Sequence, residues 1–516
     1  MPKISRLNIV FTIHVVLFVC VLTGIIPRAS TIPWTVLLIA YVFVAPLSES
    51  TLFFIRSIPL FIAIPLTPTY DAFNMWRILS LALFIKWFLS HNIFSIVQTE
   101  AKRFVTSPWC WTKTHPAISS LVTILVLAGF SLLNAGDIGL GIKRIIYFVN
   151  LSFIGIVVWD MARKTTGYKL SAVKNIAIPT ILVTLAGFIQ LAMTYQMDIF
   201  RFVDVWVSQI EKTLFGSAWA SIALKANTWF AYYGDQLSLR MFSLFPDSHS
   251  FPIFVALGLP AIFAISLWHL AEQTSFKTLI LIRGKLWVIF VPFMFLAMLL
   301  SGTRGIWAAS LGVMALWVIY LILLKRTPNR KTILKYLGGY LIIFFLMLPV
   351  SYGIFTSDQF QVQKTDKALF RKRVRSIIDI AETSNKERLR IWRLSLKSIR
   401  EKPFLGVGIG NFPVVLDQEL NLARAGSSAH NIYLHVGAEM GILVLGLCLW
   451  LIWLLMRKLF YNFVSESNSL LRIYFGMALL FVPWVLGYSL TDVALFDERA
   501  FLLFVITCAL IWNHDD

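Results

Sequence analysis

Apolar stretches of about 17–25 residues recur along the whole chain, and they constrain its fold more than any other feature. A helix of that length crosses the hydrocarbon core of a bilayer. Of the 516 residues, 58% are hydrophobic and 14% are charged, whereas an average soluble domain is about a quarter charged. One such stretch could be a signal peptide, but a dozen cannot. The sequence therefore predicts an all-α polytopic membrane protein with about 12–14 transmembrane helices and a large external loop containing amphipathic helices.

The positions of these stretches define fourteen predicted spans. They are residues 8–27, 33–47, 51–67, 74–90, 117–134, 145–161, 172–195, 252–270, 286–301, 305–324, 336–354, 432–456, 471–490 and 498–513. The short span at 33–47 leaves one alternative open, because it could pair with 51–67 as a re-entrant hairpin.

Lys and Arg in the short connections indicate the orientation of the spans. With Lys3 and Arg6 in the cytoplasm, every second short connection is basic. The short connections on the other side, 67–73, 301–304 and 491–497, hold few cations. Fourteen spans therefore place both termini in the cytoplasm.

On this topology the chain has five parts. They are N-terminal transmembrane helices (1–200), an external loop (196–250), a second set of helices that includes Arg304 (251–354), a large external loop (355–431) and C-terminal helices (432–516). The large loop has 14 basic and 8 acidic residues, a net charge of +6. A polyanionic partner is the simplest explanation, and contact with anionic headgroups of membrane lipid is the alternative. Nucleic acid is not expected, because the basic residues lie in connections between spans.

A basic amphipathic helix is predicted inside the large loop, over residues 384–400. Ser384 and Glu387 have the spacing of a capping box, and Pro403 ends the helix. Its apolar residues recur at helical spacing: Leu389, Trp392, Leu396 and Ile399. The remaining faces carry five cations: Arg388, Arg390, Arg393, Lys397 and Arg400. Such a helix can direct cations to headgroups or to a lipid-linked phosphate.

The segment GVGIGNF at residues 406–412 is predicted to form a tight turn. A dinucleotide fingerprint would need a third glycine where Asn411 stands, and no buried strand precedes it. Glycines at 406, 408 and 410 instead allow backbone to pass close to a neighbour.

His430 stands where the large loop meets the span 432–456, at the water interface. A histidine there can titrate near neutral pH and act as a general base on a hydroxyl group. The alternative is an interfacial histidine that bonds a loop carbonyl. His435 and Glu439 follow at a spacing that does not match the histidine pair of a zinc protease, so no metal site is expected.

Three further residues are predicted on the same side of the membrane. Arg304 begins a span almost without a connection, where it could contact a lipid pyrophosphate or anchor the helix by snorkelling. Arg240 and His249 precede the span 252–270, and a polar loop end would explain His249 equally well.

Together these pieces resemble the O-antigen ligase and Wzy-type polymerase superfamily. Arg304 in SGTRGIWAA is similar to the arginine that opens a helix in that family. Arg388 stands four residues before Trp392, as in the family's large loop, and the similarity continues through residues 402–412. The family's His-Asn signature corresponds to His430 and Asn431, followed by Gly441. The chain departs from the pattern at Val444, where a second glycine is common.

The resemblance implies a membrane glycosyltransferase of lipopolysaccharide or polysaccharide biosynthesis in the bacterial cytoplasmic (inner) membrane. It would transfer a glycan, with inversion, from undecaprenyl pyrophosphate to a hydroxyl of a glycolipid or glycan acceptor on the periplasmic face. Arg304 and Arg388 would stabilise the pyrophosphate, and His430 would activate the acceptor. Substrate-binding roles would fall to the following residues: Arg240, His249, Arg390, Arg393 and Asn431. No cofactor and no metal are implied.

Alternatives remain within and outside the superfamily. Ligase, polymerase and protein O-oligosaccharyltransferase share these motifs. A lipid-linked oligosaccharide flippase or other transporter is a different class, and it would use cations deep within spans, for which Arg56, Arg77 and Lys86 are candidates.

Overall fold

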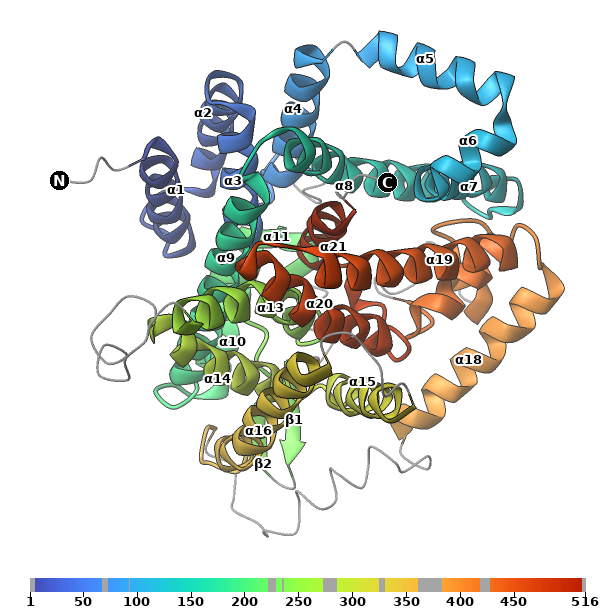
Figure 1. Ribbon diagram of the computed structural model, residues 1–516. Coiled ribbons are helices and arrows are strands. Elements are labelled where there is room, and N and C mark those ends of the chain that lie inside the picture. The colour runs from blue at the N-terminus through green and yellow to red at the C-terminus, as the bar shows by residue number, and fades with distance from the viewer. Residues whose placement is uncertain are drawn as a thin grey trace.

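The fold is a bundle of helices with one small β-hairpin (Figure 1). The structure, a computed structural model, describes residues 5–66, 73–91, 93–220, 229–233, 236–271, 285–323, 330–360, 383–417 and 427–512. The chain is an all-α polytopic membrane protein, as predicted. We call the end of the bundle that carries the described parts of residues 194–249 and 355–431 the loop face.

The helices of the first half come in the following order: α1 (Arg6–Leu22), α2 (Thr31–Val44), α3 (Leu47–Ser57), α4 (Met75–Ser90), α5 (Ile93–Thr106), α6 (Pro108–Thr114), α7 (Pro116–Ser131), α8 (Ile138–Lys164), α9 (Tyr168–Met193), α10 (Ile199–Asp204), a π-helix (Val205–Glu211) and α11 (Lys212–Phe215). The second half continues with β1 (Phe230–Tyr233), β2 (Gln236–Leu239), α13 (Ser250–Ala271), α14 (Lys285–Leu300), α15 (Arg304–Leu323), α16 (Arg330–Phe355), α18 (Thr383–Glu401), α19 (Ile432–Ser465), α20 (Ser469–Tyr488) and α21 (Glu498–Ile511). The two strands are antiparallel, and Phe230 pairs with Leu239.

Each of the fourteen predicted spans overlaps one of these helices. Among the described residues, seven helices are long and apolar enough to cross a membrane by length and composition. They are Pro116–Asn134, Ile138–Lys164, Tyr168–Met193, Ser250–Trp268, Leu337–Phe355, Ile432–Ser465 and Ser469–Tyr488. The other predicted spans fall on helices outside these seven.

The predicted span 51–67 is wrong in its last part. The α3 helix ends at Ser57, a single 3₁₀ turn follows, and the chain then runs without helix through residue 66. Its backbone groups find other partners there: Ala63 N–H donates to Leu214 O (2.9 Å), and Arg28 donates to Ala63 O (2.6 Å). Such pairing lets irregular backbone lie inside a membrane protein.

The core is centred on α13, which packs against α20, α14 and α9. Within its most apolar part 94% of the residues are buried, as expected for a helix that is hydrophobic all round. Close packing against α9 depends on Gly258, since a Cβ atom there would lie 1.9 Å from Thr180 Oγ1. The start of α13 is thereby fixed at the loop face.

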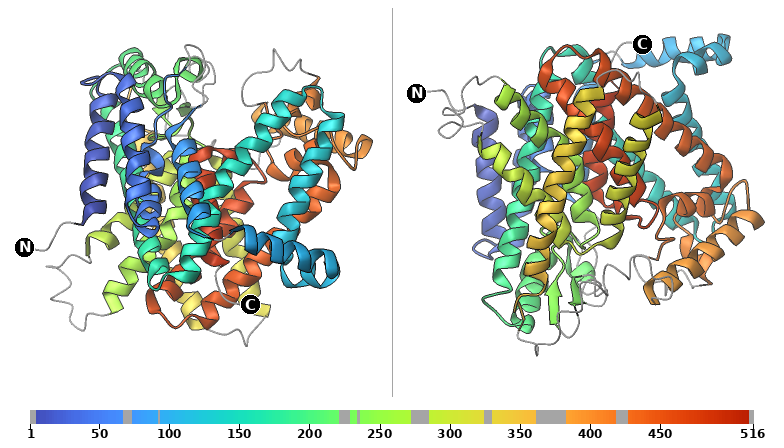
Figure 2. Two further views of the ribbon diagram at one scale, coloured as in Figure 1. Left: turned by 90° about the horizontal axis from the view of Figure 1, so that it is seen from above. Right: turned by 60° about the horizontal axis from the view of Figure 1, so that its bottom comes forward.

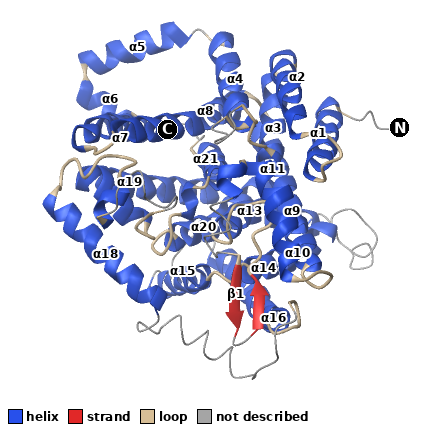
Figure 3. Ribbon diagram, turned by 180° about the vertical axis from the view of Figure 1, so that it is seen from behind, coloured by secondary structure: helices blue, strands red, loops and turns tan. Residues whose placement is uncertain are grey.

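The remaining helices surround this core unevenly. Figure 2 shows α1–α4 (blue) at one side of the bundle and α18 (orange) at the opposite side. Figure 3 shows that α5 and α6 connect α4 to α7 outside the bundle. The α18 helix lies against the start of α19, so the two elements that carry Arg388 and His430 are neighbours.

Candidate functional site

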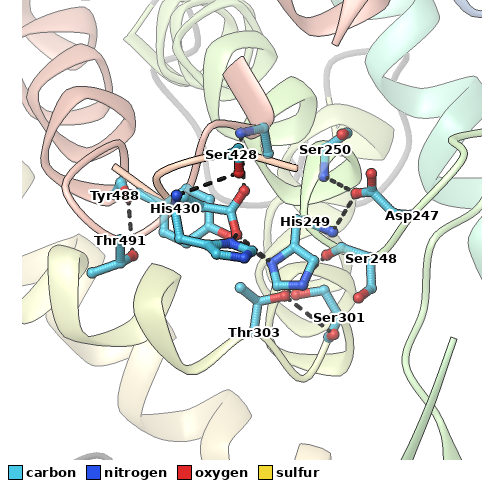
Figure 4. Close-up of polar contacts among 12 residues, drawn as sticks. Asp247, Ser248, His249, Ser250, Ser301, Thr303, Ser428, His430, Tyr488 and Thr491 are labelled. Atoms are coloured by element: carbon cyan, nitrogen blue, oxygen red, sulfur yellow. Dashed lines mark hydrogen bonds and ion pairs between the residues drawn. The ribbon is translucent and has the colours of Figure 1, made fainter. Parts of the chain in front are cut away.

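The start of α13 presents the first residue of the site. Asp247 Oδ1 accepts hydrogen bonds from the backbone N–H groups of His249 and Ser250, both at 2.8 Å (Figure 4). An aspartate that accepts from N–H groups two and three residues further on is a typical helix cap. This local cap fixes the backbone of His249, and the side chain of His249 extends toward α20.

His249 joins α13 to the connection between α20 and α21. Its Nδ1 atom is hydrogen-bonded to the Tyr488 hydroxyl group (2.8 Å) and lies 3.2 Å from Asp492 Oδ2. Asp492 is only 7% exposed, and its Oδ1 atom also accepts from Ala494 N–H (3.0 Å). The carboxylate is therefore held from both sides, which fixes its position relative to the imidazole ring.

The charges around Asp492 favour its ionised form. Burial opposes its ionisation, but the cationic side chains around it, His249 first among them, hold the pKa of Asp492 below the usual range. Burial lowers the pKa of His249, against the opposite effect of Asp492. Burial and the carboxylate therefore act in opposite directions on the pKa of His249.

His430 approaches the same carboxylate from the other side. Its Nδ1 atom lies 3.9 Å from Asp492 Oδ2, and Figure 4 shows the two imidazole rings side by side. The His430 side chain is 41% exposed, against 19% for His249. His430 is thus the histidine of the pair that is more open to a substrate.

The backbone around His430 is held in an unusual conformation. Its φ is +46°, in the left-handed region, and its N–H donates to Ser428 Oγ (3.3 Å). Trp392 on α18 donates from Nε1 to the carbonyl of Ala429 (3.0 Å). A non-glycine residue in this region is held there by its surroundings and is often found at functional sites.

Two arginines border the site near the start of α15. Arg240 donates from Nε to Ser301 O and from Nη2 to Thr303 Oγ1, both at 3.2 Å, and Thr303 in turn donates to Ser248 O (3.0 Å). The α15 helix starts at Arg304, directly beside the α20–α21 connection. A Cβ atom at Gly305 would lie 2.4 Å from Thr491 Oγ1, so Arg304 begins its helix against that connection.

Arg388 is the third cation that acts on the site. Its positive charge contributes to lowering the pKa of both Asp492 and His249, so it lies within electrostatic reach of the pair. Arg390 and Arg393, predicted to bind substrate, lie on exposed faces of α18 instead. The Arg390 side chain is 72% exposed and forms a long ion pair with Glu387, at 3.9 Å.

Asn431, also predicted to bind substrate, caps α19. Its Oδ1 atom accepts from Leu434 N–H (3.1 Å), and the residue is 7% exposed. Asn431 therefore starts the helix directly after His430. An asparagine directly before a long apolar run is a signal from which this cap could have been predicted.

The apolar residues of α18 do not all face the protein. Leu396 is 56% exposed, whereas Ile391, Leu394 and Ile399 pack against a buried cluster. The cluster consists of Val407, Phe412, Val415, Ala429 and Ala438. Apolar residues recur at helical spacing on two overlapping faces of α18. The face with Ile391 and Leu394 packs against the cluster.

The tight turn predicted over residues 406–412 is confirmed. Gly406, Gly408 and Gly410 all have positive φ, and Gly408 N–H donates to Glu439 O (2.9 Å). The α19 helix is broken at Gly441, where φ is +86° and a Cβ atom would lie 2.3 Å from Phe404 O. Backbone of the large loop thus packs into the break in α19 and ties the loop to this helix.

The prediction from sequence misses Tyr488 and Asp492. In that prediction the connection 491–497 serves only to orient the spans, because it holds few cations. An acidic residue at a membrane boundary is itself a signal of function, and Asp492 could have been found in that way.

Residues 289–449 match the sequence profile of the O-antigen ligase family. The matched range includes Arg304, Arg388 and His430, while Arg240, His249, Tyr488 and Asp492 lie outside it. No curated protein matches the chain. The match supports, over residues 289–449, the resemblance that the sequence motifs indicated.

Proposed function

We propose that this chain, placed in the O-antigen ligase superfamily by its domain at residues 289–449, transfers a glycan from undecaprenyl pyrophosphate to an acceptor hydroxyl group. The reaction takes place at the loop face, which the distribution of cations assigns to the periplasmic side of the inner membrane, with both termini in the cytoplasm. The observation that carries this proposal is the shared carboxylate of Asp492 between His249 and His430.

At the anomeric carbon the reaction forms one bond and breaks one bond, and it needs no cofactor. The acceptor oxygen forms a bond to the anomeric carbon from the face opposite the leaving group, so the configuration inverts. The bond between the anomeric carbon and the pyrophosphate oxygen breaks, and the lipid pyrophosphate leaves with the electron pair. His430 accepts the proton of the acceptor hydroxyl group, and the negative charge of Asp492 stabilises the imidazolium ion.

The arginines stabilise the leaving group. A lipid pyrophosphate gains negative charge as it departs, and fixed guanidinium groups in a partly dry site stabilise that charge strongly. Arg304 and Arg388 have this role in the proposal. Arg240 orients the start of α15 and binds the donor, while His249 holds Asp492 in place and contacts the sugar.

Two of the cations that a transporter could use, Arg56 and Lys86, bond to other parts of the protein. Arg56 donates to Asn8 (2.7 Å) and Asn175, and Lys86 donates to the backbone carbonyl of Val42 (2.8 Å). These contacts tie helices together, as expected for structural cations. Among the described residues, the cations near Asp492 are gathered on one face, which suits a transferase better than a pathway through the bundle.

A transfer assay tests the proposal. The purified protein in lipid nanodiscs would be given a lipid-linked glycan and an acceptor glycolipid, and the product measured by mass spectrometry. His430→Ala and Arg304→Ala should abolish transfer while the protein still inserts and elutes as a single species. Arg400→Ala, which removes an exposed cation of α18, is the control and should retain activity. Full activity in either site variant would remove that residue from the mechanism.

The glycolipids of a deletion strain distinguish the subclasses. Long glycan retained on the polyprenyl carrier, with uncapped lipid A-core, indicates a ligase. Lipid A-core capped by a single repeat indicates a polymerase, and an unchanged profile directs the search to glycoproteins as acceptors.

A further inference from the structure

A second pair of arginines lies at the loop face, on α4 and α8. Arg77 is in the first turn of α4 and Arg144 is in the second turn of α8. The ring of Tyr147 lies within reach of both, since each guanidinium carbon is 5.4 Å from its centroid. Arg77 also lies over Trp76 (5.2 Å), and Arg144 over Phe148 (5.1 Å) and Phe496 (5.6 Å). We call this group the arginine cage.

The guanidinium groups of the cage have unused hydrogen-bond donors. Within the part of the chain that the structure describes, their contacts are the aromatic faces, with no hydrogen bond or ion pair from either guanidinium. Arg77 Nε is buried without an acceptor. A buried donor without an acceptor costs free energy, and an anion with several oxygen atoms would satisfy it.

Nearby acidic residues are engaged elsewhere. Glu498, within electrostatic reach of Arg77, accepts from Asn74 Nδ2 (3.0 Å). Glu439, within reach of Arg144, lies 3.4 Å from His435 Nε2 and accepts from the Phe412 N–H (3.1 Å). Neither carboxylate forms an ion pair with the cage, so the two positive charges remain available to a ligand.

The surface beside the cage is apolar and exposed. Ile142 and Ile146, two residues before and after Arg144 on α8, are 45% and 60% exposed. In a membrane protein such residues face lipid chains. A ligand that reaches Arg144 along this surface therefore has an acyl or prenyl chain, and its charged group lies at the membrane boundary.

The cage and the proposed active site lie on different sides of one connection. The α8 helix packs along α21 and α15 packs along α20, and Figure 1 shows α4 and α8 on one side of the α20–α21 pair, with α15 and α18 on the other. Phe496 of the cage and Asp492 of the site belong to this same short connection. Two lipid-borne ligands could thus approach it from different directions.

We infer that the arginine cage binds the phosphate group of the acceptor, which is a phosphorylated glycolipid. The inference rests on the proposed function, because it gives the second substrate of that reaction its own anion site. The donor pyrophosphate occupies Arg304 and Arg388, and the acceptor phosphate occupies Arg77 and Arg144. Each substrate is then anchored by its own charge, and their sugars meet above Asp492.

Direct binding tests this inference without relying on activity. The probes are a synthetic glucosamine disaccharide lipid with one phosphate, the same lipid without phosphate, undecaprenyl pyrophosphate and phosphatidylglycerol. Each would be titrated by native mass spectrometry into wild type, Arg144→Gln and the double variant Arg77→Gln/Arg144→Gln in a neutral detergent. Arg201→Gln on α10, an exposed arginine of the loop face, is the matched control.

The expected result is selective. Arg144→Gln should weaken binding of the phosphorylated glycolipid about tenfold, and the double variant more, with no change for the dephosphorylated lipid, for undecaprenyl pyrophosphate or in Arg201→Gln. Unchanged affinity in both cage variants overturns the inference. A loss confined to undecaprenyl pyrophosphate assigns the cage to the donor, and equal competition by phosphatidylglycerol makes it a general lipid site; both outcomes also overturn it.

A kinetic arm separates this inference from the proposed function. In the transfer assay, Arg144→Gln should raise the KM for the acceptor about tenfold and leave the KM for the donor and kcat unchanged. If the protein binds the phosphorylated glycolipid through the cage but transfers no glycan, the inferred site stands and the proposed function is wrong. If the protein transfers glycan and its KM for the acceptor does not change in Arg144→Gln, the proposed function stands and the inferred site is wrong.

Discussion

The Nδ1 atom of His249 lies 3.2 Å from Oδ2 of Asp492, which joins the start of α13 to the connection between α20 and α21. His430 reaches the same oxygen at 3.9 Å. One buried carboxylate thus contacts two imidazole rings from distant parts of the sequence. Its negative charge is the property on which the proposed proton transfer depends.

Asp492→Asn should therefore reduce kcat on the order of 100-fold, the contribution typical of general acid–base catalysis. The amide has the same shape as the carboxylate but cannot stabilise a histidinium ion by charge. The transfer rate of purified protein in nanodiscs provides the measurement, and size-exclusion chromatography controls for folding. Wild-type activity in the Asp492→Asn variant would show that the charge has no part in the reaction.

Trp392→Phe should lower kcat about fivefold, the factor that corresponds to a net hydrogen bond of about 1 kcal/mol. The phenyl ring retains most of the packing but cannot donate to Ala429 O, so the backbone at His430 is held less firmly. Leu396→Ala, an exposed position of the same helix, is the control. An equal effect of both substitutions would point to general destabilisation of α18.

Gly441→Ala should destabilise the fold by about 1–3 kcal/mol, because alanine is strained at a φ of +86° and its Cβ would meet Phe404 O at 2.3 Å. Gly446→Ala in the same α19 helix is the control, since no atom lies within 4 Å of its Cβ position. Thermal unfolding in detergent, followed by intrinsic fluorescence, should show a lower midpoint for the first variant alone. Equal midpoints would mean that the break in α19 carries no strain.

Asp497 should make stability fall as pH rises. Burial, with a contribution from neighbouring Glu498, raises the pKa of Asp497 to about 7. Between roughly pH 4, the ordinary aspartate value, and pH 7 the unfolded chain has released this proton and the folded chain has retained it. The stability that Asp497 contributes is therefore complete below about pH 4 and is lost by the time the pH passes about 7.

The variant that tests this is Asp497→Asn, which still accepts from the N–H groups of Arg499 and Ala500 as a helix cap. The unfolding midpoint of wild type should drop more between about pH 5 and pH 8 than that of the variant. Parallel pH profiles for the two proteins would contradict the raised pKa.

Helix positions were predictable because apolar length alone selects spanning segments, and each of the fourteen predicted spans overlaps a helix. The error at 51–67 arose because the backbone partners of residues 61–66, Arg28 and Leu214 among them, are distant in sequence. Periodicity carries no information about such partners.

Site residues were predictable where a local motif marks them. Arg304 and His430 stand at helix starts, and Arg388 stands one turn before Trp392. The pairing of His249 with Asp492 depends on how α13 packs against α20, which a single sequence does not reveal. The exposure of Arg390 and Arg393 likewise depends on which of two overlapping faces α18 buries.

The position of Asp492 has a consequence for biosynthesis. Its connection joins the last two helices that the structure describes, so Asp492 is the last of the proposed active-site residues to be synthesised. Until then the nascent chain holds His249, Arg304 and His430 without the carboxylate that pairs the histidines. Chains that terminate before α20 lack both Tyr488 and Asp492, so interrupted translation leaves the proposed site incomplete.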